Sequence, residues 1–266
     1  MNPTSSSQSA HLDSFMRFSD RLRQNLAARA DVLGLVFMGS AAARERVDEW
    51  SDHDFAVVTV DGAEERLRDD LSWLPDRDEA ALAVREEHDG LKVVYDDGHV
   101  LEFGVTSVAG LSSWYANAYE VVLDRGGVAE AFARVAARPK PSQSARPNRE
   151  LGLFVALLII GVGRFRRGEV LVASQLVRTY AVGHLVTAWR LLRPSADRDR
   201  LDDLDPFRRF EQVYSAAGHA IANALDHDVE SAARTLLDLA EAEFGEHVDF
   251  PRRAATAVRR RLGWLR

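Results

Sequence analysis

The chain has 266 residues, of which 46% are hydrophobic, and its formal net charge is −7. It contains no cysteine, which excludes disulfides, thiolate catalysis and cysteine-ligated zinc. This length suits one large or two ordinary domains, and the acidic balance argues against a general nucleic-acid binder, because affinity for phosphates requires concentrated Lys and Arg.

Neither a leader nor a membrane span is expected. The first ten residues are polar and lack the basic-then-apolar order of a signal peptide, so we expect a frayed tail there. The longest apolar run, Leu151 to Gly163, is too short to cross a bilayer and predicts a buried core helix. These features favour a cytoplasmic protein with no membrane partner.

The first 138 residues predict a mixed α/β arrangement. Helical spacing of apolar residues predicts a helix over 11–30, and β-rich runs predict central strands over 33–38 and 55–60. A hairpin is predicted over 91–105, because its two β-rich runs are joined by Asp96-Asp97-Gly98 and Asp-Gly is a strong hairpin signal. The remaining elements are helices over 63–73, 111–118 and 127–137 and short strands over 82–85 and 120–123. A hairpin among interleaved strands and helices favours a mixed sheet over a purely parallel one.

The second half predicts only helices. Residues 138–148, RPKPSQSARPN, are rich in Pro, Ser and charge and mark the domain boundary. Beyond them the pattern predicts helices over 149–167, 170–192, 206–225, 229–244 and 251–264, with Pro206 and Pro251 at helix openings. The predicted fold class is therefore α+β: a mixed-sheet domain with flanking helices over residues 1–138, followed by a helical bundle domain over 149–266.

Two aspartates at the second strand suggest a metal site. A strand alternates its side chains with period two, so Asp52 and Asp54 should project from one face roughly 7 Å apart, while His53 points to the other face. Two carboxylates suit Mg²⁺, which takes the rest of its shell from water and phosphate. The alternative is an ordinary surface loop, in which Asp-x-Asp is common.

A Gly-Ser corner precedes these aspartates. Gly39 leaves room for a phosphate to approach the backbone, and we expect Ser40 to cap a short helix over 41–43 whose free N–H groups attract anions. A Gly-Ser pair also starts many ordinary helices. The order of buried strand, Gly-Ser and Asp-x-Asp is what favours a triphosphate site.

A third acid lies on the second arm of the hairpin. Val100, Glu102 and Gly104 share one face of that strand, and the apolar residues alternate on the other. Burying a carboxylate in such a strand is unfavourable unless it binds a metal or acts in catalysis. The alternative is that the strand lies at the edge of the sheet and this face is solvated.

This composite pattern resembles the nucleotidyltransferase superfamily, which includes polymerase beta and the antibiotic-modifying adenylyltransferases. The segment DDGHVLEF is similar to the aminoglycoside 6-adenylyltransferases, whereas ARPNR at the linker and RRGE in the bundle are similar to the lincosamide nucleotidyltransferases. The acid on the 99–105 strand falls two residues from its lincosamide position, so the branch stays open.

The resemblance implies a nucleotidyltransferase-type fold and an enzyme that uses Mg²⁺ and a nucleoside triphosphate, with ATP favoured. It would transfer the nucleoside monophosphate to a hydroxyl of a small antibiotic-like acceptor and release pyrophosphate. A polynucleotide acceptor is disfavoured by the acidic charge. The implied roles are catalysis and metal binding for Asp52, Asp54 and Glu102, nucleotide binding for Gly39, Ser40, Arg44 and Arg46, and acceptor binding for Arg167 and Glu169.

The second domain would bind the acceptor and mediate a homodimer. The rival interpretation is a non-catalytic or regulatory nucleotide-binding protein of the same fold, such as a component of a toxin and antitoxin pair.

Overall fold

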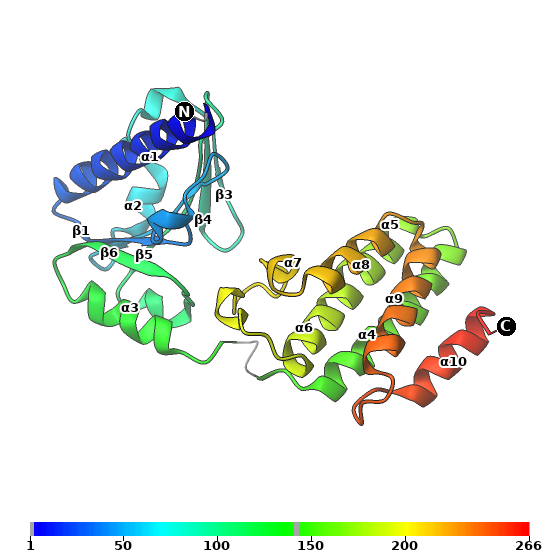
Figure 1. The fold of residues 1–266 in the computed structure, drawn as a ribbon. Helices are drawn as coiled ribbons and strands as arrows, with labels where there is room; N and C mark the ends of the chain where they lie inside the picture. The colour runs from blue at the N-terminus through cyan, green and yellow to red at the C-terminus, as the bar shows by residue number, and fades with distance from the viewer. Residues whose placement is uncertain (1–2, 141–143, 266) are drawn as a thin grey trace. The chain divides into compact units, whose positions relative to one another are not determined.

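The chain folds into two compact units, Met1–Arg138 and Pro139–Arg266. The structure is a computed structural model that describes residues 3–140 and 144–265 (Figure 1). Each unit has its own hydrophobic core, so the two are described separately.

The first unit is built on a six-stranded sheet with the order β3-β4-β5-β2-β1-β6. Strands β2 and β5 run parallel, and the other neighbouring pairs are antiparallel. The prediction of a mixed sheet is therefore confirmed. The strands are β1 Val32–Met38, β2 His53–Thr59, β3 Ala80–Arg85, β4 Gly90–Tyr95, β5 Val100–Ser107 and β6 Tyr119–Asp124.

Helices cover both faces of this sheet (Figure 1). Helices α1 Pro3–Ala27 and α2 Glu64–Asp69 lie on one face, where Phe55 and Phe103 stack inside the core. Helix α3 Val128–Ala137 and the 3-10 turn Gly110–Ser113 lie on the other face, against Ala56 and Val58. The alternation of β2 side chains between two cores fixes which residues of that strand share a face.

The second unit is a helical bundle, as predicted. Helix α4 Pro147–Arg166 lies at its centre, and Trp189 packs edge-on against Phe244 at 5.0 Å between ring centroids. No helix in the described part of the chain is long and apolar enough to cross a membrane. The other helices are α5 Val170–Ser174, a π-helical segment Gln175–Ala181, α6 Val182–Leu192, α7 Phe210–Val213, α8 Ser215–Leu225, α9 Val229–Phe244 and α10 Arg252–Leu262.

Several predicted helix boundaries are wrong. Helix α1 begins at Pro3 instead of at residue 11, because a polar stretch can continue a helix without adding to its apolar face. In place of a helix over 111–118 there is the short 3-10 turn, since the Arg138 guanidinium binds the carbonyl oxygens of Ser112 and Trp114. The helix predicted from residue 206 begins only at Phe210, because Arg209 adopts a left-handed φ of 62°.

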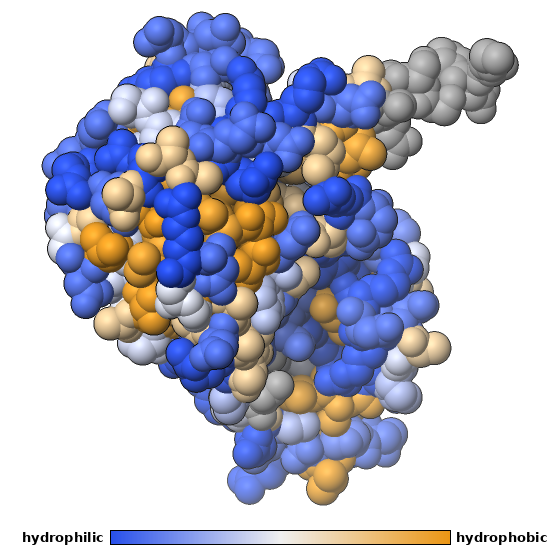
Figure 2. All heavy atoms as spheres, turned by 90° about the vertical axis from the view of Figure 1, so that its left-hand side faces the viewer, coloured by the Kyte–Doolittle hydropathy of each residue, from blue (hydrophilic) through white to orange (hydrophobic). Residues whose placement is uncertain are grey.

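The surface is largely polar, with apolar side chains left exposed in places. Figure 2 shows one face on which hydrophilic residues surround a hydrophobic area. In the second unit, large apolar side chains remain exposed on α4, α5 and the π-helical segment. They are Ile160, Val170, Leu171, Val172 and Tyr180, of which Leu171 is 89% exposed.

Candidate functional site

The Gly-Ser corner lies directly against the second aspartate of the Asp-x-Asp pair. Gly39 follows the last residue of β1 with a φ of 57°, a left-handed conformation that favours glycine. A Cβ atom added at this position would stand 3.4 Å from Oδ2 of Asp54. The corner and the Asp54 carboxylate are therefore adjacent, although 14 positions separate the two residues in the sequence.

The corner is a turn and not the start of a helix, contrary to our prediction. Ala42 N–H donates to the Met38 carbonyl and Ala43 N–H to the Ser40 carbonyl, and the left-handed Gly39 breaks the path into a helix. Only a 3-10 turn, Arg44–Arg46, follows. Ser40 thus caps no helix, and any anion bound here would meet turn N–H groups and arginines.

Two predicted arginines flank the corner. The Arg46 guanidinium donates to the Gly39 carbonyl oxygen at 2.7 Å. Arg44 is exposed, and its nearest carboxylate is that of Glu120, at 3.7 Å. Both cationic groups therefore lie on the turn that follows Gly39, where a phosphate at the corner would be within their reach.

Glu102 stands beside Asp54 on the neighbouring strand. The parallel register of β2 and β5 pairs these two residues directly, so their side chains leave the same face of the sheet about 5 Å apart at the backbone. The sheet order also places β5 in the interior, which excludes the edge-strand alternative for Glu102. The Glu102 side chain is nevertheless 49% exposed, so this stretch of the face is partly solvated.

A lysine neutralises the Glu102 carboxylate. Lys92, the cross-strand partner of Glu102 on β4, donates a hydrogen bond to Oε1 of Glu102. This hydrogen bond is the main cause that raises the pKa of Lys92 above its usual value. Glu102 must therefore exchange this partner before it can bind a metal ion or take a proton. Nothing in the sequence pattern pointed to Lys92, although the register of the hairpin could have identified it.

Two positions beyond Glu102 on β5, a glycine leaves room for an aromatic ring on this face of the sheet. Gly104 lies under the indole ring of Trp114, which a Cβ atom at Gly104 would meet at 2.5 Å. Trp114 therefore covers the sheet immediately beyond Glu102 and limits the open part of the face to the Asp54 end.

Asp52 lies just ahead of β2, at the end of the same strand pair. Among the described residues, no group of three or more histidine or acidic side chains is arranged to hold a metal ion. The chemistry of the donor set still fits Mg²⁺, because this ion prefers carboxylate oxygens and commonly takes only one or two from the protein. Asp52 and Asp54 are two such carboxylates. The prediction that they share one face rested on strand alternation, which does not extend to Asp52 because β2 begins at His53. Asp52 lines the same pocket as His99, and Asp54 does not line it.

The two predicted acceptor-binding residues lie in the second unit, at the junction of α4 and α5. Glu169 accepts a hydrogen bond from Arg164 at 2.7 Å and lies 3.5 Å from Arg167. Gly168 between them has a φ of 80°, which turns the chain from one helix into the next. All three charged side chains are partly exposed, and within their own unit they form one ion-pair network.

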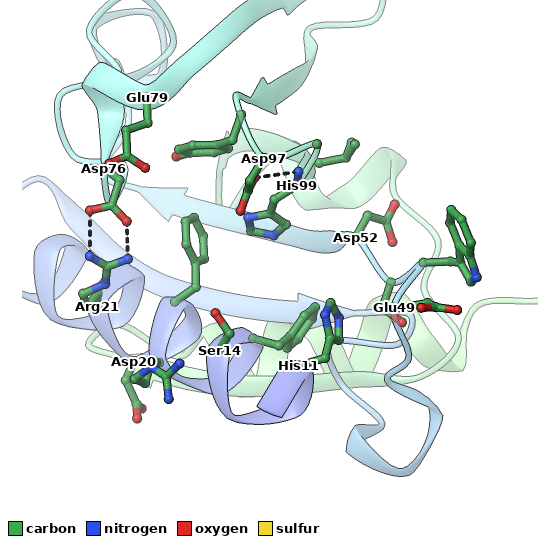
Figure 3. Close-up of a pocket in the computed structure, with 18 residues that line it drawn as sticks. His11, Ser14, Asp20, Arg21, Glu49, Asp52, Asp76, Glu79, Asp97 and His99 are labelled. Atoms are coloured by element: carbon green, nitrogen blue, oxygen red, sulfur yellow. Dashed lines mark hydrogen bonds and ion pairs between the residues drawn. The ribbon is translucent and has the colours of Figure 1, made fainter. Parts of the chain in front are cut away.

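A large pocket in the first unit was missed by sequence reasoning. Its volume is about 1160 Å³, and it lies between α1, the segment 49–52 ahead of β2 and the turn ahead of β5 (Figure 3). We call it the α1 pocket. Asp52 is the predicted site residue that lines it. Its charged lining, among the described residues, consists of six carboxylates and two guanidiniums: Asp20, Glu49, Asp52, Asp76, Glu79, Asp97, Arg17 and Arg21.

Two histidines, His11 and His99, line this pocket, and a third, His53, is buried beneath it. As predicted, His53 points away from the face of Asp54, and its ring is fully buried against that of Phe15 at 3.6 Å between centroids. Its Nδ1 lies 2.8 Å from Nε2 of His99, and its Nε2 lies 2.8 Å from Oγ of Ser19. Burial lowers the pKa of His53 to about 3 and also lowers the pKa of His99.

Comparison with known proteins gives only remote structural similarities. No protein-family model matches the chain, and no curated protein sequence matches it. An aminoglycoside 6-adenyltransferase from Bacillus subtilis superimposes with a TM-score of 0.29 at 10% identity, over 92% of this chain and 90% of that one. A chain from the structure of the CdnC:HORMA-deltaN complex of E. coli MS115-1 superimposes with a TM-score of 0.31 at 15% identity, over 94% of this chain and 90% of that one. Scores this low do not establish a common fold, so function has to be inferred from the site residues.

Proposed function

We propose that this chain is a Mg²⁺-dependent nucleotidyltransferase. It transfers a nucleoside monophosphate from a nucleoside triphosphate to a hydroxyl of a small antibiotic-like acceptor and releases pyrophosphate. ATP is the favoured triphosphate, so the transferred group is AMP. The observation that supports this best is the meeting of the Gly39 corner with Asp54, with Glu102 beside Asp54 on the parallel strand. A backbone corner open to phosphate next to carboxylates is the arrangement that nucleotide transfer requires.

Each side chain of the site has a role in this proposal. Asp52 and Asp54 would hold Mg²⁺, which when bound neutralises charge on the phosphates. The turn at Gly39 and Ser40 would receive the phosphate chain, and Arg44 and Arg46 would add positive charge beside it. The bond to the α-phosphorus forms from the acceptor oxygen as the bond to the β-phosphate oxygen breaks, and pyrophosphate leaves.

Glu102 would take the proton of the attacking hydroxyl. Its carboxylate must first separate from the ammonium group of Lys92. An exposed ion pair of this kind is worth no more than about 1 kcal/mol, so substrate binding can separate it. The proton then resides on Glu102 until solvent removes it.

The charge of the α1 pocket favours one acceptor class over the other. Six carboxylates against two guanidiniums attract a molecule with several ammonium groups. An aminoglycoside carries several such groups, whereas a lincosamide carries a single basic amine. The pocket therefore supports the aminoglycoside alternative, and the cytoplasm, which supplies ATP and Mg²⁺, would be the place of action. Antibiotic resistance would be the physiological role.

We propose that Arg167 and Glu169 contact the acceptor, and that the exposed apolar side chains around Leu171 are covered by a second copy in a twofold homodimer. Light scattering at working concentrations should then give twice the chain mass. A monomer would contradict the dimer.

One observation favours the rival function. Lys92 holds the Glu102 carboxylate in an ion pair. A protein that binds nucleotide without transferring it, such as a toxin or antitoxin component, would not need a free base at this position.

A substrate screen separates the two functions. Aminoglycosides and lincosamides are each incubated with every nucleoside triphosphate and Mg²⁺, and pyrophosphate and product mass are measured. We expect pyrophosphate and an acceptor heavier by one nucleoside monophosphate, with Asp54→Asn protein purified in the same way as the control for contaminants. Nucleotide binding without pyrophosphate would support the rival, and absence of nucleotide binding would contradict both.

A further inference from the structure

A chain of hydrogen bonds under the α1 pocket fixes the tautomers of two histidines. The Ser19 hydroxyl donates its single proton to the Phe15 carbonyl at 3.0 Å. The contact of 2.8 Å between Ser19 Oγ and Nε2 of His53 is therefore a hydrogen bond that the imidazole donates. His53 is fully buried, and the two side chains to which it bonds, a serine and a second imidazole, supply no negative charge, so its ring is neutral and its Nδ1 carries a lone pair.

The same logic extends one residue further. His99 Nε2 lies 2.8 Å from Nδ1 of His53, and since that Nδ1 can only accept, His99 must donate from Nε2. The other ring nitrogen of His99, Nδ1, then carries a lone pair in the neutral ring. No described residue hydrogen-bonds to this Nδ1, and His99 is only half-buried where it lines the pocket (Figure 3). Buried histidine and serine thus orient an acceptor atom toward the pocket.

A second imidazole in the pocket also lacks a partner. Nε2 of His11, from α1, is buried and makes no hydrogen bond within the described part of the chain. A buried polar atom without a partner costs roughly 1–3 kcal/mol unless water or a ligand satisfies it. Two imidazoles of this pocket therefore have hydrogen-bonding capacity that no described residue uses.

The remaining lining defines what such a ligand is. Phe18 and Tyr95 offer apolar ring surfaces, which suit the C–H groups of a saturated ring. One of the six carboxylates, Asp76, is already paired with Arg21, and the others leave the pocket acidic. A saturated ring that carries both hydroxyls and ammonium groups meets all three conditions.

We propose that the α1 pocket binds a hydroxylated cyclic amine, and that His99 is a binding residue whose Nδ1 accepts a hydrogen bond from a ligand hydroxyl. His53 and Ser19 act as positioning residues that hold His99 in this tautomer. Within the proposed function this ligand is the acceptor, which would approach the site from the side of Asp52, the predicted site residue that lines the pocket. Binding itself requires neither nucleotide nor transfer, so it is tested independently of that function.

The binding experiment uses three ring compounds that separate the parts of the proposal. Streptamine carries hydroxyls and two amines, myo-inositol carries hydroxyls only, and trans-1,4-diaminocyclohexane carries amines only. Isothermal titration of the full chain without nucleotide should show that streptamine binds and that its affinity falls with added salt. The affinities of myo-inositol and trans-1,4-diaminocyclohexane should be at least about tenfold weaker. Equal binding of diaminocyclohexane, or no binding of streptamine, overturns the proposal.

Two substitutions at one position test the role of His99. In His99→Asn the amide oxygen takes the place of Nδ1, so the hydrogen-bond acceptor toward the pocket is kept. In His99→Gln the amide nitrogen takes the place of Nε2, and the acceptor toward the pocket is lost. We expect streptamine affinity to fall about fivefold in His99→Gln, and to stay within about twofold of the parent in His99→Asn. His88→Gln, at an exposed position outside the pocket, is the control and should bind as the parent does. Parental affinity in His99→Gln contradicts the role of His99.

A spectroscopic measurement tests the tautomers directly, without any ligand. Long-range ¹H–¹⁵N correlation spectra of the full chain should show His53 and His99 both protonated at Nε2 and unprotonated at Nδ1. Protonation of His99 at Nδ1 would overturn the proposal. If pyrophosphate is never released but streptamine binds through His99, the enzymatic function fails while the binding site stands.

Discussion

The buried imidazole of His53 should make the first unit sensitive to acid. Burial lowers its pKa from 6.5 to about 3, so the folded chain keeps this ring neutral at a pH where the unfolded chain protonates it. The unfolded state therefore binds more protons between these two values, and the free energy of unfolding falls as the pH falls through this range. Above about pH 6.5 the full stability is present.

The size of the effect follows from the two pKa values. At pH 5 the folded ring is still neutral while the unfolded one is mostly protonated, which lowers the free energy of unfolding by about 2 kcal/mol relative to pH 8. Between pH 6.5 and 3 the loss grows by at most about 1.4 kcal/mol per pH unit and amounts to about 4 kcal/mol. The ring is fully buried, so solvent does not screen the effect. Burial also lowers the pKa of His99, which adds a loss of the same sign.

Hydrogen exchange of β2 measures this loss within the first unit. The exchange rates of the 53–59 peptide at pH 8 and pH 5, corrected for intrinsic rates, give the free energy of opening at each pH. His53→Gln keeps a polar side chain at this position but cannot titrate, so its loss between the two pH values should be smaller by about 2 kcal/mol. His88→Gln controls for the removal of a histidine as such. An equal loss in the parent and in His53→Gln would refute the reasoning.

The remaining predictions concern the proposed transfer. Asp52→Asn and Asp54→Asn should each abolish transfer in a folded protein, because each removes a charged ligand at nearly constant shape; turnover within about tenfold of the parent would exclude the residue from the mechanism. Glu102→Gln should keep nucleotide binding, measured by titration, but lose about 10² to 10⁴ in rate, and a full rate would mean that the base lies elsewhere. Gly39→Ala should cost about 1–2 kcal/mol of stability from its left-handed φ and also reduce transfer, because its Cβ lies beside the Asp54 carboxylate. Gly62→Ala, with a φ of 82° and open space around it, should show a similar cost in thermal unfolding without the loss of transfer.

Local patterns were sufficient for the strands, for most of the helices and for their order along the chain. The Asp97-Gly98 turn identified the hairpin that forms β4 and β5, and period-two alternation identified the faces of β5. These features depend on residues close in sequence, whose geometry a short segment fixes by itself. Helix ends were less predictable, because the partners that stop a helix can be distant. The Arg138 guanidinium, which takes the carbonyl oxygens near residue 112, is such a partner.

The sequence by itself predicted the β-strands beside which a Gly-Ser corner, two aspartates and a third acid lie, because β-rich runs, turns and alternation are local properties. Only the tertiary structure decided that Asp54 and Glu102 are register partners, that Lys92 neutralises Glu102, and that His53 and His99 meet beneath a pocket. These contacts join residues from different strands, and their register depends on the packing of the whole sheet against its helices. No pattern within a single segment carries that information.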